Sequence, residues 1–309
     1  RRDDTLIDVL APGWSLPLLA RMPEVRKGIE MPLTHGQLEF GLRRDLGRSL
    51  KGKYDQAMVL PNSWKSGVVP WAAGIRRRTG WVGEFRYGLL NDARRLDKKK
   101  LSMTVQRFVA LAAKRGEPLP EIAPPSLRVN AGDLMAAMQA LGVKKQARRK
   151  VLALCPGAEY GEAKRWPEAS YAQLAAAYIE QGWDIWLFGS HKDASVCSAI
   201  NAQTGDRCTD LSGHTELAQA VDLMSLADAV VSNDSGLMHV AAALNRPLVA
   251  VYGSSDPGFT PPLNAQHAIA SLKLSCSPCF KRECPLGHLN CLRQLPVEQV
   301  SASLQQVLR

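Results

Sequence analysis

The sequence lacks any hydrophobic run long enough to cross a lipid bilayer, which needs about 20 consecutive apolar residues. It also shows no signal peptide, with its basic start, apolar middle and small-residue cleavage site. These two absences argue against a membrane-spanning or secreted protein and predict a cytoplasmic one. With 309 residues, 46% of them hydrophobic and 22% charged, the chain can form one large or two medium globular domains.

Two common nucleotide-binding motifs are missing as well. Neither GxGxxG, the dinucleotide fingerprint, nor GxxxxGK[ST], the P-loop, occurs in the chain. There is no internal repeat and no low-complexity tract. The first half does not interleave aromatic residues with lysines, as a base-stacking surface for single-stranded nucleic acid would.

The charge that is present is distributed unevenly. Residues 1–150 carry 29 Lys and Arg against 14 Asp and Glu, a net charge of +15, whereas residues 151–309 carry 10 against 15, a net charge of −5. Basic runs occur at 76–78 and 98–100. This asymmetry indicates that the first half meets an anionic partner, either nucleic acid, an anionic membrane surface or a phosphorylated substrate. The alternative is a solvated surface without a partner.

Short β-rich runs alternate with longer amphipathic stretches. We expect strands at 6–12, 57–61, 151–157, 184–190, 228–233 and 247–253. We expect helices at 38–52, 63–74, 103–116, 129–142, 167–182, 192–203, 215–227, 237–245 and 295–309. Strands separated by helices predict an α/β fold with parallel sheets. The proline-rich segment 117–126 and the charged connection 144–150 predict a first domain at 1–147 and a second at 148–309, with the last helix a candidate to cross back.

Three polar, glycine-containing loops follow expected strands of the second half, at 155–167, 188–193 and 232–239. Ligands of doubly wound sheets bind beyond the carboxyl ends of the strands, where helices begin. Free N–H groups of Ser235, Gly236 and Leu237 would favour an anion there, and Lys164 could add a positive charge. His239 is a candidate to line this site. The simpler interpretation of Asp234-Ser235-Gly236 is a helix cap.

A second feature is the sequence CSPCFKRECPLGHLNC at 276–291. Its thiols, Cys276, Cys279, Cys284 and Cys291, together with His288 could enclose a structural zinc ion. In a reducing compartment metal binding is favoured over disulfides. The alternative is a tight loop with free thiols, because the spacing does not give two matched CxxC pairs.

Four longer motifs are VLPNSWKSG at 59–67, RTGWVGEFRYGLLND at 78–92, CPGAEYGEAKRWP at 155–167 and NDSGLMHVAAALNRPLVAVYGSSDPGFTPPL at 233–263. They resemble the ADP-heptose:lipopolysaccharide heptosyltransferase II family, within glycosyltransferase family 9. The resemblance implies a GT-B architecture, in which two Rossmann-like parallel-sheet domains face a cleft. The first domain would bind the acceptor and the second the ADP-sugar.

The resemblance also implies roles for individual residues. Lys164 would contact the ADP phosphates, and Asp234, Ser235 and Gly236 match the family's D-[ST]-G, whose backbone donors hold the pyrophosphate. Glu216 is a candidate to reach the ribose. The acceptor contacts would be Lys65 and Arg86.

The implied reaction is an inverting transfer of heptose from ADP-L-glycero-D-manno-heptose to the heptosylated inner core of lipopolysaccharide. No metal ion is required, because Lys164 and helix-end dipoles would stabilise the departing ADP. The family's usual base is an aspartate in the loop after its first strand. Asp3 and Asp4 precede a strand instead, so the catalytic base is unknown and the chain alone is expected to bind ADP but to transfer little.

The resemblance also implies a role for the positive charge of the first half. The acceptor is lipid-linked and rich in phosphate and carboxylate, so a basic domain would attract it. The same domain would be attracted to the anionic inner leaflet. The protein is therefore expected in the cytoplasm, bound peripherally at the inner face of the inner membrane. The alternatives are another inner-core sugar transferase of the same fold, and a basic nucleic-acid-binding protein with a zinc element at 276–291.

Overall fold

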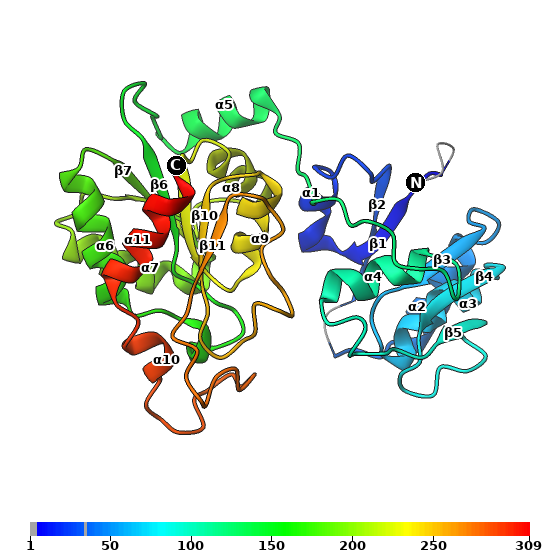
Figure 1. Cartoon of the computed structure of the whole chain (residues 1–309). Helices are drawn as coiled ribbons and strands as arrows, with labels where there is room; N and C mark the ends of the chain where they lie inside the picture. The colour runs from blue at the N-terminus through cyan, green and yellow to red at the C-terminus, as the bar shows by residue number, and fades with distance from the viewer. Residues whose placement is uncertain (1–4, 34–35) are drawn as a thin grey trace. The chain divides into compact units, whose positions relative to one another are not determined.

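The structure, a computed structural model, describes residues 5–33 and 36–309. Asp3 and Asp4 lie outside the described residues. The chain forms two compact units, which Figure 1 shows with their helices and strands labelled. Unit 1 comprises residues 1–31, 124–257 and 261–309, and unit 2 comprises residues 32–123 and 258–260.

Unit 1 is built on a six-stranded sheet whose strands all pair in parallel. The strand order is β11-β10-β9-β6-β7-β8. Their bounds are β6 Val151–Cys155, β7 Asp184–Leu187, β8 Thr209–Asp210, β9 Ala229–Asn233, β10 Leu248–Val251 and β11 His267–Ala270. The chain starts in the middle of the sheet, moves to one edge, and returns to the middle at β9. The order therefore reverses between β6 and β9, which is where doubly wound folds bind their ligands.

Both faces of this sheet are buried, because alternate residues of each strand point to opposite sides. Leu152 and Leu154 of β6 pack with α6 (Glu168–Glu180), α7 (Ala194–Gln203) and α11 (Val297–Val307). Val151 and Ala153 face α5 (Ala131–Ala140), α8 (Leu217–Met224) and α9 (Gly236–Ala243). Figure 1 shows these helices around the sheet. The near-continuous apolar strands of the second half are explained by this double burial.

The last helix does not leave this unit. Val300, Leu304 and Val307 of α11 are buried in the same core as the strands of the six-stranded sheet. Residues 295–309 thus belong to unit 1. The apolar face of α11 is already covered by α6, β10 and β11.

The N-terminal segment belongs to unit 1 as well, so this unit is built from separate stretches of the chain. It forms β1 (Asp8–Pro12), α1 (Leu16–Leu19) and β2 (Lys27–Met31), and the two strands pair in parallel. Arg21 Nη2 lies 2.6 Å from Asp222 Oδ2 in α8 and 3.0 Å from Asp133 Oδ2 in α5. The Asp222 side chain is only 1% exposed, so this ion pair joins the segment to the later sequence inside the unit.

Unit 2 contains a parallel three-stranded sheet, β3 (Gln56–Val59), β4 (Arg77–Trp81) and β5 (Asp92–Arg94). Its helices are α2 (Phe40–Ser49), α3 (Val68–Ala72) and α4 (Thr104–Ala112). The expected helix at 63–74 is split into a 3-10 turn, Trp64–Gly67, and α3. Pro70 lies in the first turn of α3, where a missing N–H leaves no hydrogen bond unmade.

The structural division sharpens the charge asymmetry. Unit 2 carries 18 Lys and Arg against 8 Asp and Glu, a net charge of +10. Unit 1 carries 21 of each, so its net charge is zero. The whole excess of positive charge therefore belongs to unit 2. Within the described residues, no helix combines the length and apolar character that a membrane span requires.

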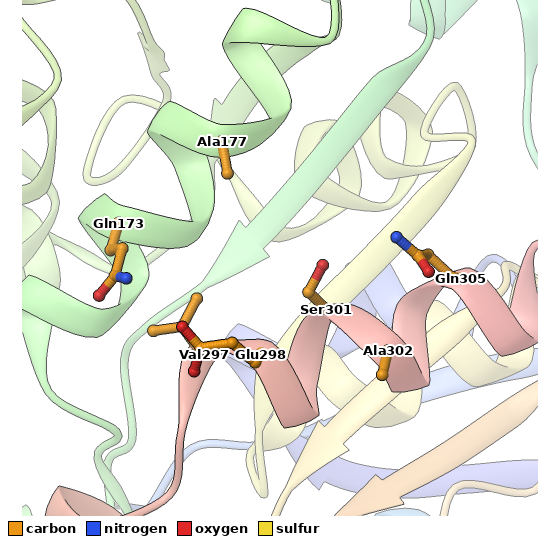
Figure 2. Close-up of a pocket in the computed structure, with 7 residues that line it drawn as sticks. All are labelled: Gln173, Ala177, Val297, Glu298, Ser301, Ala302 and Gln305. Atoms are coloured by element: carbon orange, nitrogen blue, oxygen red, sulfur yellow. The ribbon is translucent and has the colours of Figure 1, made fainter.

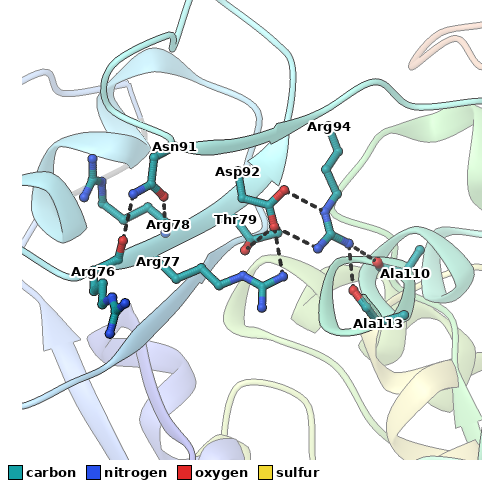
Figure 3. A network of polar contacts seen from close by, with 9 residues as sticks. All are labelled: Arg76, Arg77, Arg78, Thr79, Asn91, Asp92, Arg94, Ala110 and Ala113. Atoms are coloured by element: carbon teal, nitrogen blue, oxygen red, sulfur yellow. Dashed lines mark hydrogen bonds and ion pairs between the residues drawn. The ribbon is translucent and has the colours of Figure 1, made fainter. Parts of the chain in front are cut away.

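Part of the basic run at 76–78 has an internal partner, as Figure 3 shows. Asp92 Oδ2 accepts hydrogen bonds from Arg94 Nη2 at 2.8 Å, from Arg77 Nη2 at 3.2 Å and from the Thr79 hydroxyl at 3.1 Å. Arg94 also donates to the carbonyls of Ala110 and Ala113 at the end of α4. Hydrogen bonding from Arg94, with smaller contributions from Arg77 and Thr79, lowers the pKa of Asp92 to about 2.

We expect Asp92→Asn to reduce the free energy of unfolding by about 2 kcal/mol at pH 7, the cost of losing a pKa shift of this size. A lowered pKa stabilises the fold above the unfolded-state value, near 4, and this stabilisation disappears as the pH falls towards 2. In urea unfolding, the difference in the free energy of unfolding between the unaltered protein and Asp92→Asn should therefore become smaller from pH 7 to pH 3. Asp45→Asn, which breaks an exposed ion pair with Arg44, is the control and should cost under about 1 kcal/mol. A difference independent of pH would contradict the prediction.

Candidate functional site

The polar loops at the switch point of unit 1 meet around one ion pair. Lys164 ends a 3-10 turn, Glu162–Lys164, in the loop after β6, and Asp234 directly follows β9. Lys164 Nζ lies 2.5 Å from Asp234 Oδ2. The hydroxyl of Ser255, which comes after β10, donates to the same oxygen at 2.5 Å. The structure thus brings together two predicted donor-site residues and adds Ser255, which the sequence analysis did not select.

Asn233, the last residue of β9, fastens the loop that carries Lys164. Its side chain donates to the carbonyl of Pro156 at 2.7 Å and accepts from the backbone N–H of Trp166 at 3.1 Å and from the Tyr171 hydroxyl at 3.1 Å. Asn233 is fully buried. A buried amide satisfied on both sides holds its partners in one geometry, so Asn233 fixes both ends of the Lys164 loop.

The N-terminus of α9 lies beside this ion pair in the sequence. Ser235 is the N-cap, but its side chain makes no capping hydrogen bond. A Cβ added at Gly236 would meet no protein atom within 4 Å, so packing does not require glycine there. Open space over a helix N-terminus suits the approach of an anionic ligand. Leu237 is half-buried against the core, and His239 is exposed on the helix.

The second polar loop, after β7, contributes a close backbone approach. Asp193 accepts hydrogen bonds from the Ser190 N–H at 2.9 Å and from the Ser190 hydroxyl at 2.7 Å. A Cβ on Gly157 would lie 2.4 Å from the Asp193 carboxyl carbon, so only glycine fits where the first loop passes the second. This contact explains why the loop after β6 begins with Pro156-Gly157.

The remaining predicted residues lie elsewhere. Glu216 is the N-cap of α8, and its backbone N–H donates to the Gln219 side chain at 2.9 Å. Lys65 and Arg86 belong to unit 2. Lys65 Nζ donates to the carbonyl of Gln37 at 3.1 Å. The 276–291 segment stays within unit 1.

Arg86 is buried, unlike a typical substrate contact. Its guanidinium donates to the carbonyl of Trp81 at 2.6 Å, to that of Pro61 at 2.5 Å and to the Ser66 hydroxyl at 2.9 Å. Burial lowers the pKa of Arg86. These bonds connect the end of β4 to the loop after β3, so Arg86 fixes the segment that presents Lys65.

The four cysteines at 276–291 do not form the predicted zinc site. Across residues 5–33 and 36–309, no group of three or more His, Cys, Asp or Glu side chains is arranged to hold a metal ion. All four thiols, those of Cys276, Cys279, Cys284 and Cys291, are free. Cys276 is exposed, whereas burial, together with the neighbouring thiols of Cys276, Cys284 and Cys279, raises the pKa of Cys291. A closed tetrahedral site would need four thiolates converging on one point.

A shallow depression lies between α6 and α11, as Figure 2 shows. Its lining residues are Gln173, Ala177, Val297, Glu298, Ser301, Ala302 and Gln305. They include neither Lys164 nor Asp234, and they provide one carboxylate, that of Glu298, and no positively charged side chain. This depression is therefore separate from the candidate site.

Comparison with known proteins identifies the family. Residues 43–290 match the family model described as Glycosyltransferase family 9 (heptosyltransferase). The chain is 46% identical over 319 residues to Lipopolysaccharide heptosyltransferase 2 of Escherichia coli strain K12, covering 100% of this chain and 91% of that protein. It is 49% identical over 282 residues to Lipooligosaccharide heptosyltransferase 2 of Haemophilus influenzae, covering 86% and 80%.

Solved structures give the same result. The structure of Escherichia coli ADP-heptose lipopolysaccharide heptosyltransferase II superposes with a TM-score of 0.85 at 43% identity, over 100% of this chain and 91% of that one. The Escherichia coli heptosyltransferase WaaC with ADP has a TM-score of 0.71 at 18% identity, over 99% and 91%, a likeness of fold alone. The prediction of an α/β fold with parallel sheets of the GT-B class is confirmed. The chain therefore belongs to glycosyltransferase family 9, the heptosyltransferases.

Proposed function

We propose that this protein transfers heptose, with inversion, from ADP-L-glycero-D-manno-heptose to the heptosylated inner core of lipopolysaccharide. The observation that carries the proposal is the Lys164–Asp234 pair beside the uncapped N-terminus of α9, at the point where the strand order reverses. The similarity to heptosyltransferase 2 enzymes over the whole chain supports the substrate class. The family match gives no support to a nucleic-acid-binding protein.

In this proposal unit 1 binds the donor. The pyrophosphate lies against the backbone N–H groups of Ser235, Gly236 and Leu237, and Lys164 contacts its oxygens. As the bond to the anomeric carbon breaks, negative charge grows on the departing ADP, and these groups stabilise it. His239 lines the site, and Glu216 is the candidate for the ribose. The base that deprotonates the acceptor hydroxyl is unassigned.

Unit 2 binds the acceptor, through Lys65 and the loop that Arg86 holds. Its net charge of +10 suits an oligosaccharide rich in phosphate and carboxylate. The same charge favours peripheral binding to an anionic inner leaflet, where each basic residue near the surface contributes roughly 1 kcal/mol. The protein would then act at the cytoplasmic face of the inner membrane.

The test is a transfer assay with ADP-heptose and a mono-heptosylated acceptor, run beside calorimetric titration with ADP. We expect ADP to bind, and heptose to be preferred over glucose supplied as ADP-glucose. A chelator should leave the measured rate unchanged, because the proposed donor contacts come from Lys164 and backbone N–H groups. Equal use of both sugars would favour another inner-core transferase of the same fold. Failure of ADP to bind would contradict the proposed donor site.

A further inference from the structure

The segment 277–282, within the cysteine-rich loop, packs against the loop that carries Lys164. The backbone N–H of Ala163 donates to the carbonyl of Arg282 at 3.1 Å, and the Tyr160 hydroxyl donates to the carbonyl of Phe280 at 2.8 Å. A Cβ on Gly161, whose φ is +150°, would lie 2.5 Å from the Arg282 carbonyl oxygen. Only glycine permits this approach. The backbone of Arg282 is therefore held against Ala163, the residue before Lys164.

The same segment is attached to a second loop of the donor site. The backbone N–H of Phe280 donates to the carbonyl of Ser254 at 2.7 Å, and the Ser277 hydroxyl donates to the carbonyl of Gly253. Ser255, the next residue, donates to Asp234. Segment 277–282 therefore joins both loops that position the Lys164–Asp234 pair.

Two positive side chains share one aromatic ring at this junction. Lys164 Nζ lies 5.0 Å from the centre of the Tyr160 ring, and Arg282 Cζ lies 5.3 Å from it. Both contacts have the geometry of cation–π interactions. The two charges are thus within about 10 Å of each other, a separation that one diphosphate and its hydrogen bonds can bridge.

Lys164 and Arg282 differ in their ion-pair partners. Asp234, only 5% exposed at its side chain, neutralises much of the charge of Lys164. By contrast, no carboxylate among the described residues lies within 4.0 Å of the Arg282 guanidinium. Glu159, beside Tyr160, pairs instead with Lys192 at 2.7 Å. Arg282 therefore has no ion-pair partner at this distance and acts on Glu159 only from further away, where its charge helps to lower the pKa of that carboxyl, whereas Lys164 pairs directly with Asp234.

We propose that Arg282, oriented by Tyr160, is a second positively charged binding residue for the diphosphate of the donor. The proposal rests on the donor site described under Proposed function and adds a group from the cysteine-rich loop to it. A guanidinium donates two parallel hydrogen bonds to phosphate oxygens, and the backbone contacts of residues 280–282 preorganise it for that contact.

The test compares Arg282→Gln with Lys281→Gln, which removes the same charge from the neighbouring exposed residue. Calorimetric titration with ADP should show Kd raised about tenfold in Arg282→Gln, the cost of one charge-assisted contact, and less than twofold in Lys281→Gln. AMP, which lacks the second phosphate, should be affected less than ADP. Arg282→Lys should recover part of the ADP affinity, because the charge remains while the two parallel hydrogen bonds of the guanidinium are lost.

Equal effects of the two glutamine substitutions would overturn the proposal, since they would reflect general surface charge. An Arg282→Lys variant as weak as Arg282→Gln would overturn it as well, because the side chain would then act through packing. These outcomes are distinct from failure of the donor site itself. If the unaltered protein does not bind ADP, the proposed function fails; if it binds ADP and Arg282→Gln binds equally well, only this inference fails.

Discussion

Replacement of Lys164 with methionine is expected to lower kcat/KM for heptose transfer by about 10²- to 10³-fold, the usual cost of removing one preorganised group that stabilises developing negative charge. In our proposal Lys164 interacts with the diphosphate in the ground state, and this interaction becomes stronger as negative charge develops on the departing ADP. Most of the loss should therefore appear in kcat, with a smaller rise in the KM of the donor. Steady-state kinetics with varied ADP-heptose measure both.

The stability of this variant must be measured in parallel. Without Lys164 the carboxylate of Asp234 is buried, and within the described part of the chain the Ser255 hydroxyl is the hydrogen-bond donor that remains, which is destabilising. The double variant Lys164→Met, Asp234→Asn removes that buried charge and should recover stability without recovering activity. Recovery of activity in the double variant would show that Lys164 acts only by neutralising Asp234.

Lys145→Met is a matched control for Lys164→Met. Lys145 Nζ lies 3.3 Å from Asp228 Oδ2, and Asp228 precedes β9 at the amino end of the same sheet. The change removes a lysine from a lysine–aspartate pair, yet it does so at the opposite edge from the donor site. We expect nearly normal kinetics. A loss comparable to that of Lys164→Met would indicate that unit 1 responds to lost charge at any position.

The second large effect is expected at Asn233. Asn233→Ala leaves the N–H of Trp166 and the carbonyl of Pro156 without their partner in a buried site, and it frees the Tyr171 hydroxyl. Unsatisfied buried groups cost about 1–3 kcal/mol each, so the free energy of unfolding should fall by about 3 kcal/mol or more. The loop that carries Lys164 also loses its attachment to β9, so the KM of the donor should rise.

Two variants separate positioning from stability in this case. Tyr171→Phe removes only one of the three hydrogen bonds, so it should give a smaller change in the same direction. Asn264→Ala removes a buried asparagine that donates to the carbonyls of Arg246 and Gln266, before β11 and away from the donor loops. It should destabilise the protein without raising the KM of the donor. If Asn264→Ala raised that KM as much as Asn233→Ala, a specific positioning role would be excluded.

The architecture of the second half of the chain was predictable from the sequence alone, and so was the position of the polar loop after β9 at the edge of the sheet. The sequences of β6, β7, β9 and β10 are short and apolar, and helical patterns follow them. Strands that are buried on both faces of a sheet have nearly continuous apolar sequences, so these four could be predicted. Asp234-Ser235-Gly236 was predictable because a polar, glycine-containing turn after such a strand must lie at the carboxyl edge of the sheet. Strands β2, β4, β5, β8 and β11 were not predicted: β5 and β8 have only three and two residues, β2 and β11 are mostly only partly buried, and β4 begins with two arginines.

Tertiary structure alone decided which residues support that loop. Asn233 and Ser255 looked like ordinary turn residues, and their importance comes from partners 67 and 21 positions away in the sequence. The boundary between the units was decided in the same way, because Arg21 and Asp222 are 201 residues apart and no local pattern predicts that they pair. Local composition and periodicity determine where strands and helices form, whereas hydrogen bonds and ion pairs between distant segments exist only once the chain is folded. For this protein the sequence therefore specified the sheet and the polar turn after β9, and the fold specified what holds Lys164 beside Asp234.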